Sequence, residues 1–227
     1  MNQTNSLKYN LLLGLSFVLI MASLALVFLY APTEKEMGEI QRIFYFHVPL
    51  GWIAFLAFFV VFVSSILYLR NRDSKWDTLA HSSAEIGVIF TTLVLITGPI
   101  WAKPVWGSWW EWEARLTSSL VLWLTYLAYL LVRSYAREES RGARFAAVMG
   151  IVGFINVPIV YLSVRLWRTQ HPPHLVDTLE GSMLLTLLIG VAAFTFLYVL
   201  LAYHRTTLMN QARKVRILRQ TLDEREE

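Results

Sequence analysis

Five of the nine tryptophans in the sequence lie in one stretch, from Trp101 to Thr117, which reads W-A-K-P-V-W-G-S-W-W-E-W-E-A-R-L-T. These five are Trp101, Trp106, Trp109, Trp110 and Trp112. Indole rings favour the headgroup layer of a membrane, which accounts for part of this pattern. It does not account for so many indoles beside acidic and basic side chains and the turn-forming Gly107. We expect such a surface to bind a large, flat, aromatic ligand that carries carboxylates.

The elements that position this stretch are predicted to be membrane-spanning helices. The chain has 227 residues, 56% of them apolar, and its charges gather in short segments between long apolar runs. Six of these runs are long enough to cross the hydrocarbon core of a bilayer, at about residues 9–30, 43–69, 79–101, 116–132, 145–164 and 182–203. We therefore predict an all-α, polytopic membrane protein with a single membrane domain over residues 1–227 and a charged cytoplasmic tail at 204–227. No small-residue cleavage site follows the first run, so we expect it to be a retained span.

The distribution of lysine and arginine predicts the orientation of these spans. Fourteen of these residues lie on the face that holds both termini and six on the opposite face, so the positive-inside rule places both termini in the cytoplasm. The tryptophan-rich stretch, between the third and fourth spans, then forms an outer loop. The same bias accounts for the net charge of +4 without a nucleic-acid partner. The absence of cysteine excludes disulfides, thiolate metal sites and a covalent C-x-x-C-H haem attachment.

The predicted topology places three of the five histidines on the face of the tryptophan-rich stretch, namely His47, His171 and His174. A neutral imidazole is a common axial ligand of haem iron, and two imidazoles from different segments can fill both axial positions. A platform of indoles with one histidine on each side would hold a porphyrin. Its propionates would pair with Arg115, or with Lys103 or Arg168, and arginine is the better suited to bidentate contact.

The sequence alone leaves simpler interpretations of these residues open. Any single tryptophan at a helix end is more often an interfacial anchor than part of a ligand platform. His47 lies two residues before Pro49, so it is also suited to capping a distorted first helical turn. His174 lies three residues after His171, across a pair of prolines, and rivals it as the second ligand.

Two further polar sites lie within predicted spans. Glu85 follows His81 by four residues, a spacing that predicts a local pair on one helix face, although an ionisable group at that depth is also a functional candidate. Asn156 and Pro158 interrupt the fifth apolar run. We expect them to mark a kink with a satisfied amide rather than a transport site.

Residues 106–118, W-G-S-W-W-E-W-E-A-R-L-T-S, resemble the WWD-like signature of the haem-handling membrane proteins of bacterial cytochrome c maturation, W-G-x-W-W-x-W-D-x-R-L-T-S. F-H-V-P at 46–49 and W-x-T-x-H at 167–171 match the two histidine-bearing segments of one family among them, the haem exporter protein C (CcmC) family. The order of these motifs, the six spans and the chain length agree with that family over nearly the whole chain. One position departs from the signature, because Glu113 stands where it has Asp and its carboxylate reaches one methylene further.

The resemblance implies a haem-binding protein of the bacterial inner membrane. His47 and His171 would be the axial ligands of a non-covalent, transiently bound haem b at the periplasmic face. The five tryptophans, Glu113 and Arg115 would complete the haem site. The haem would pass to the periplasmic haem chaperone CcmE, in a complex with the ABC-type subunits CcmA and CcmB and the small subunit CcmD. Such a role is transfer rather than conventional enzymatic turnover, since cofactor and acceptor supply the reacting atoms.

Two other functions are compatible with the same residues. A haem-binding membrane subunit of a redox enzyme would use the same ligands for electron transfer, although such subunits usually hold haem between histidines buried within their helices. A small-solute transporter without haem would need a polar path near the bilayer midplane, for which Glu85 and Asn156 are the candidates.

Overall fold

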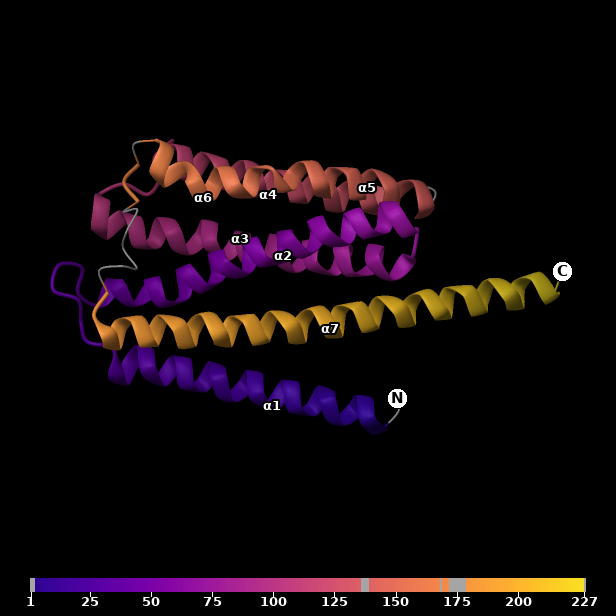
Figure 1. The fold of residues 1–227 in the computed structure, drawn as a ribbon, viewed down its shortest axis with the longest axis horizontal. Helices are drawn as coiled ribbons and strands as arrows, with labels where there is room; N and C mark the ends of the chain where they lie inside the picture. Colours follow the sequence, from indigo (N-terminus) through magenta and orange to yellow (C-terminus); the bar gives the residue numbers. More distant parts are fainter. Residues whose placement is uncertain (1–2, 136–138, 168, 172–178, 227) are drawn as a thin grey trace.

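The structure is a computed structural model that describes residues 3–135, 139–167, 169–171 and 179–226. The described residues form helices and connecting segments, with no β-strand among them (Figure 1). The helices are α1 (Gln3–Ala25), α2 (Phe44–Asn71), α3 (Ser74–Trp106), α4 (Ala114–Tyr135), α5 (Glu139–Phe154), α6 (Asn156–Leu166) and α7 (Gly181–Glu226). A π-helical turn (Leu26–Tyr30) extends α1, and a 3₁₀ helix (Glu39–Ile43) precedes α2. Within the described part of the chain, six helical stretches are long and apolar enough to cross a membrane, which confirms the predicted number of spans.

The helices lie side by side along one long axis, and α2 lies at the centre of the bundle (Figure 1). It packs against α3, α5 and α7, while α1 packs against α7, and α4 packs against α5, α6 and α3. The start of α1 and the end of α7 lie at the same end of the bundle (Figure 1). The connection between α3 and α4 lies at the opposite end, together with the start of α2 and the end of α6 (Figure 1). That the termini face the cytoplasm remains a prediction.

Helix α3 extends farther than predicted. It runs to Trp106 instead of ending near residue 101, and it contains Pro99 and Pro104. Trp101 and Trp106 therefore lie on a helix, and only residues 107–113 form the connection to α4. The helix ends where Gly107 adopts a positive φ of 82°, a conformation that a glycine takes without strain. The tryptophan-rich stretch is thus partly helix and partly loop.

The fifth predicted span consists of two helices, α5 and α6, with a break at Ile155. Pro158 has no N–H to donate to the carbonyl of Phe154, which weakens the helix at this point. The side-chain amide of Asn156 donates a hydrogen bond of 2.9 Å to the carbonyl of Ser118 on α4. The expected kink and the expected satisfied amide are both confirmed.

Helix α7 continues without interruption past residue 203, where the sixth span was predicted to end, as far as Glu226. The charged tail is therefore helical. Figure 1 shows this part of α7 projecting beyond the ends of the other helices.

Ionisable side chains pair between helices near the end of the bundle that holds the termini. The predicted pair of His81 and Glu85 is present, with 3.5 Å between Nε2 and Oε1. Arg205 of α7 makes the closer contact to Glu85, through Nε at 2.5 Å and Nη2 at 2.7 Å. Asp77 of α3 pairs with Arg133 of α4 at 2.7 Å. Because both arginines bind a carboxylate through two nitrogens, these pairs fix the position of α3 relative to α4 and α7.

A glycine allows α2 and α3 to approach each other closely. A Cβ atom at Gly87 of α3 would lie 2.5 Å from a ring carbon of Phe58 on α2. The ring of Phe58 has no space to move aside, because it is fully buried and stacks on the ring of Tyr126 with centroids 3.7 Å apart. Position 87 therefore requires a residue without a side chain.

We expect Gly87→Ala to destabilise the detergent-solubilised protein, since overpacking of this kind costs about 1–3 kcal/mol. The measurement is the midpoint of thermal unfolding. Gly14→Ala on α1 is the matched control, because a Cβ atom there meets nothing within 4 Å. Its midpoint is expected to stay the same or to rise slightly, since alanine favours helix more than glycine does. Equal midpoints for the two variants would contradict the close contact between α2 and α3.

Candidate functional site

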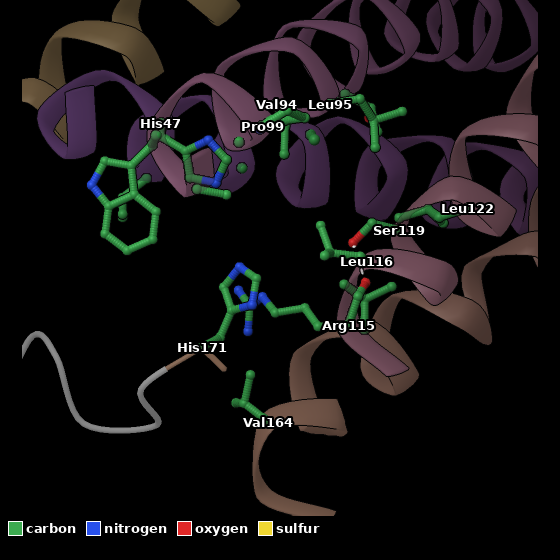
Figure 2. Close-up of a pocket in the computed structure, with 18 of the residues that line it drawn as sticks. His47, Val94, Leu95, Pro99, Arg115, Leu116, Ser119, Leu122, Val164 and His171 are labelled. Atoms are coloured by element: carbon green, nitrogen blue, oxygen red, sulfur yellow. Dashed lines mark hydrogen bonds between the residues drawn. The ribbon is translucent and has the colours of Figure 1, made fainter. Parts of the chain in front are cut away.

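A cavity of about 520 Å³ lies between α2, α3, α4, α6 and the segment 169–171 (Figure 2). Its wall includes residues from the start of α2, the end of α3, the start of α4 and the end of α6. These parts of the helices lie at the end of the bundle opposite the termini (Figure 1). Its volume falls within the range of about 300–1,000 Å³ that is usual for ligand sites. Most of its wall is apolar, and the ionisable side chains in the wall are His47, Arg115, Tyr161, Arg165 and His171. An apolar cavity with a few polar groups is typical of a small-molecule site.

The two histidines predicted as ligands both line this cavity. His47 is in the first turn of α2, and His171 is in the segment that follows α6. Figure 2 shows the two imidazole rings directed toward the same space from different elements. His174, the rival candidate, lies outside the described residues, so the choice between it and His171 stays a prediction.

Each of the two rings has one nitrogen engaged by the protein. Nδ1 of His47 lies 2.8 Å from the hydroxyl oxygen of Thr97 on α3. Nδ1 of His171 lies 2.5 Å from Oε1 of Glu113. Neither Nε2 has a hydrogen-bond partner among the residues that the structure describes. Both Nε2 atoms are therefore available to a ligand in the cavity.

The backbone around His171 is held by two side chains. The hydroxyl of Thr169 accepts a hydrogen bond from the N–H of His171 at 3.0 Å, which closes a short turn. Oε2 of Glu113 accepts a hydrogen bond from the N–H of Gln170 at 2.7 Å. The carboxylate of Glu113 thus binds both the ring of His171 and the neighbouring backbone. Glu113 is behind His171 and is not part of the cavity wall.

The surroundings of His171 favour its neutral form. Burial lowers the pKa of His171 from its ordinary value of 6.5, and the positive charge of Arg115 lowers it further. Glu113 acts in the opposite direction, and the net effect is a lowered pKa. The ring is therefore neutral at pH 7, which is the form that binds a metal ion.

The five tryptophans have different positions relative to the cavity. Trp101, Trp106 and Trp109 line it, whereas Trp110 and Trp112 do not. The rings of Trp101 and Trp106 meet edge to face with centroids 4.9 Å apart, and Trp106 meets the ring of His171 at the same distance. Trp109 is 58% exposed and Trp112 is 75% exposed. Trp106 therefore contacts His171 and Trp101 packs behind it, whereas Trp109 and Trp112 lie nearer the surface and Trp110 is half-buried.

Two arginines contribute positive charge to the cavity wall. Arg115 lies in the first turn of α4 and Arg165 near the end of α6. The ammonium group of Lys103 is engaged elsewhere, because it donates a hydrogen bond of 2.8 Å to the carbonyl of Gly107. Arg168, the third cation that the sequence suggests, lies outside the described residues. Arg115 and Arg165 are thus the cations placed to meet an anionic ligand.

The sequence-based prediction does not include Thr97, Gly98 or Arg165, although all three belong to the site. Thr97 contacts His47, and Gly98 lies beside the same ring. No motif marks either residue, and their contact with His47 spans fifty positions. Arg165 lies two residues before the W-x-T-x-H motif, and that proximity is the one signal in the sequence that identifies it.

This arrangement fits a flat, metal-centred, anionic ligand. Two imidazoles could supply axial donors to a metal whose in-plane ligands come from a porphyrin. Indole rings match an apolar macrocycle, and two guanidinium groups match two carboxylates. The residues present at this site therefore fit haem.

Comparison with known proteins gives consistent matches over most of the chain. The model of the CcmC family, described as Heme exporter protein C, matches residues 2–221. A Heme exporter protein C of Bradyrhizobium diazoefficiens is 38% identical over 192 residues, which cover 82% of this chain and 72% of the relative. Those of Haemophilus influenzae and Escherichia coli K12 are 31% and 33% identical over 218 and 142 residues. These matches cover 92% and 63% of this chain, and 89% and 58% of the respective relatives.

The order of the motifs, the six membrane-spanning helices and the match of a family model to nearly all residues lead to one conclusion. The chain belongs to the heme exporter protein C family.

Proposed function

We propose that this protein binds haem b non-covalently between His47 and His171 and passes it to a periplasmic haem chaperone, CcmE, for the maturation of c-type cytochromes. One observation carries the proposal: two imidazoles from distant segments face one cavity, each with Nδ1 engaged and Nε2 unengaged. Relatives at 38% and 31% identity have the name Heme exporter protein C, which supports haem as the ligand.

The side chains of the cavity wall have separate roles in this proposal. His47 and His171 donate their Nε2 lone pairs to the two axial positions of the iron. The indoles of α3 contact the apolar macrocycle and keep water from its edge. Arg115 and Arg165 bind the propionates, which are the only charged groups of the ligand's periphery.

Arg115 supports the anionic nature of the ligand. Its side chain is half-buried at the cavity, and the charge of Glu113 acts on it without a direct ion pair or side-chain hydrogen bond among the described residues. A half-buried cation without a direct partner is costly, and a ligand that brings a carboxylate lowers this cost. The propionate of a haem would be such a counter-ion.

The proposal includes a location and an assembly. The cavity would open to the periplasm from the bacterial inner membrane, as the excess of Lys and Arg at the other end of the bundle suggests. The chain would act in a complex with the ABC-type subunits CcmA and CcmB and the small subunit CcmD, which the family resemblance implies. Trp109, which lines the cavity and is largely exposed, offers an aromatic surface to the haem acceptor.

We expect His47→Ala and His171→Ala to lower the affinity for haem by about 100-fold or more, because loss of outer partners of a metal ligand already costs about 10–100-fold. The measurements are haem titration of the purified protein, followed by its Soret absorption, and haem transfer to CcmE. His204→Ala is the matched control, since His204 contacts Tyr9 at the opposite end of the bundle. It should leave titration and transfer unchanged.

His174→Ala tests the choice between the two outer histidines. Loss of haem in this variant, with normal binding by His171→Ala, would assign the second ligand to His174. Unchanged spectra and full transfer in His47→Ala and His171→Ala would exclude the haem site itself. Haem that stays bound in the presence of CcmE and exchanges electrons with a quinone would instead indicate a redox subunit.

We expect Arg115→Gln to weaken haem binding by roughly 10–100-fold, since a hydrogen bond to a charged group contributes about 1.5–3 kcal/mol. The measurement is a comparison of haem with haem dimethyl ester, whose propionates carry no charge. Binding of the ester should be insensitive to Arg115→Gln. Lys103→Gln is the control, because the ammonium group of Lys103 binds Gly107 and is not in the cavity wall. Equal loss of affinity for both porphyrins in Arg115→Gln would exclude a propionate contact.

A further inference from the structure

The hydroxyl of Thr97 lies 2.8 Å from two atoms, the carbonyl oxygen of Leu93 and Nδ1 of His47. Toward the carbonyl the hydroxyl can only donate its single proton. When it makes that bond, it is an acceptor toward Nδ1 of His47. Nδ1 then carries the ring proton, and in a neutral imidazole the lone pair is on Nε2. The cavity is thus faced by the nitrogen that can bind a metal.

Gly98 provides the space in which this ring lies. A Cβ atom at Gly98 would be 3.4 Å from Cε1 of His47, and apart from the chain neighbours and the nearby backbone of α3 no other described atom would lie within 4 Å of it. The imidazole therefore rests against the backbone of α3, one residue after its hydrogen-bond acceptor. A side chain larger than a methyl group at position 98 would displace the ring.

Glu113 contacts Nδ1 of His171 as Thr97 contacts Nδ1 of His47, but the acceptor is a charged carboxylate. The N–H at Nδ1 of His171 donates to Oε1, and the side chain of Glu113 is only 8% exposed. A hydrogen bond to a carboxylate is roughly twice as strong as one between neutral groups. It also raises the basicity of a ligating imidazole. His171 and His47 therefore differ in donor strength although both are imidazoles.

We propose that Thr97 and Gly98 form a seat that presents Nε2 of His47 to the ligand, and that the charged acceptor Glu113 makes His171 the stronger of the two axial donors. This inference rests on the proposed function for the identity of the ligand. Thr97, Gly98 and Glu113 are positioning residues, since each acts through a histidine.

The first test needs no haem. In protein labelled with ¹⁵N at histidine, the nitrogen chemical shifts distinguish the Nδ1–H tautomer from the Nε2–H tautomer, and His47→Gln assigns the signals of His47. We expect wild type and Thr97→Ser to hold His47 as Nδ1–H, and Thr97→Val to give a mixture of tautomers. Thr207→Val is the matched control, because Thr207 makes the same bond to its own helix, to Tyr203 at 2.8 Å, far from the cavity.

The second test compares the two acceptors through the rate at which haem leaves the protein. We expect Thr97→Val to raise the dissociation rate of haem by roughly 10-fold and Glu113→Gln by roughly 100-fold, the range found for outer partners of metal ligands. Gln is nearly isosteric with Glu, and its one amide oxygen can still accept the hydrogen bond from Nδ1 of His171, so the variant removes the charge together with the acceptor for the N–H of Gln170. Glu113→Asp keeps the charge and should stay closer to wild type than Glu113→Gln.

The outcomes separate this inference from the proposed function. An Nε2–H or mixed tautomer of His47 in wild type would overturn the role of Thr97 whether or not haem binds. A larger effect of Thr97→Val than of Glu113→Gln on dissociation would overturn the ranking of the two donors. A wild type that binds no haem at all would remove the proposed function, while the tautomer measurement would still test the seat.

Discussion

The site depends on hydrogen bonds that leave each histidine with one unengaged ring nitrogen. A neutral imidazole has one N–H and one lone pair, and the partner of the N–H decides where the lone pair points. Thr97 engages Nδ1 of His47 and Glu113 engages Nδ1 of His171, from two different parts of the chain. The apolar wall strengthens both bonds, because water does not compete for the donors. In the proposed function, the histidines bind the centre of the ligand, and the indoles and arginines bind its periphery.

The packing of α2 against α3 holds one of these bonds in place. Gly87, Thr91, Val94 and Gly98 recur on α3 at the spacing of a single helix face. At one end of this face Gly87 meets Phe58, and about three turns later Gly98 meets His47. The same face therefore packs against α2 near the middle of the bundle and forms the cavity wall near its end. Close approach of the two helices is what brings a threonine hydroxyl within hydrogen-bond distance of an imidazole on its neighbour.

The six spans were predictable because bilayer thickness sets the length of an apolar run, and the kink was predictable because proline lacks an N–H. The end of α3 at Trp106 was not predictable. Pro99 and Pro104 suggest an earlier end, whereas the helix continues through both and ends at Gly107. Contacts between distant residues have no local signal: Glu113 meets His171 across 58 positions, and Arg205 meets Glu85 across 120. The role of Thr97 could not be predicted for another reason. A threonine in an apolar helix commonly donates a hydrogen bond to the backbone of its own helix, as Thr91 does. The sequence therefore does not indicate that Thr97 also contacts His47.

The residue that departs from the family signature explains how two unlike elements can hold one ligand. His47 is fixed by a helix pair, whereas His171 is on a short segment outside the helices, which donates hydrogen bonds to Glu113 and Thr169. The carboxylate of Glu113 must reach that segment from residues 107–113, and the extra methylene relative to Asp lengthens its reach by about one C–C bond, ~1.5 Å. Both carboxylate oxygens are used, one on the ring and one on the backbone. The charged acceptor thus fixes the position of a non-helical segment and, in the proposed ranking of the two donors, also makes its imidazole the stronger one. Within the proposed function, one strong and one weaker axial donor suit a site that collects its ligand and then releases it.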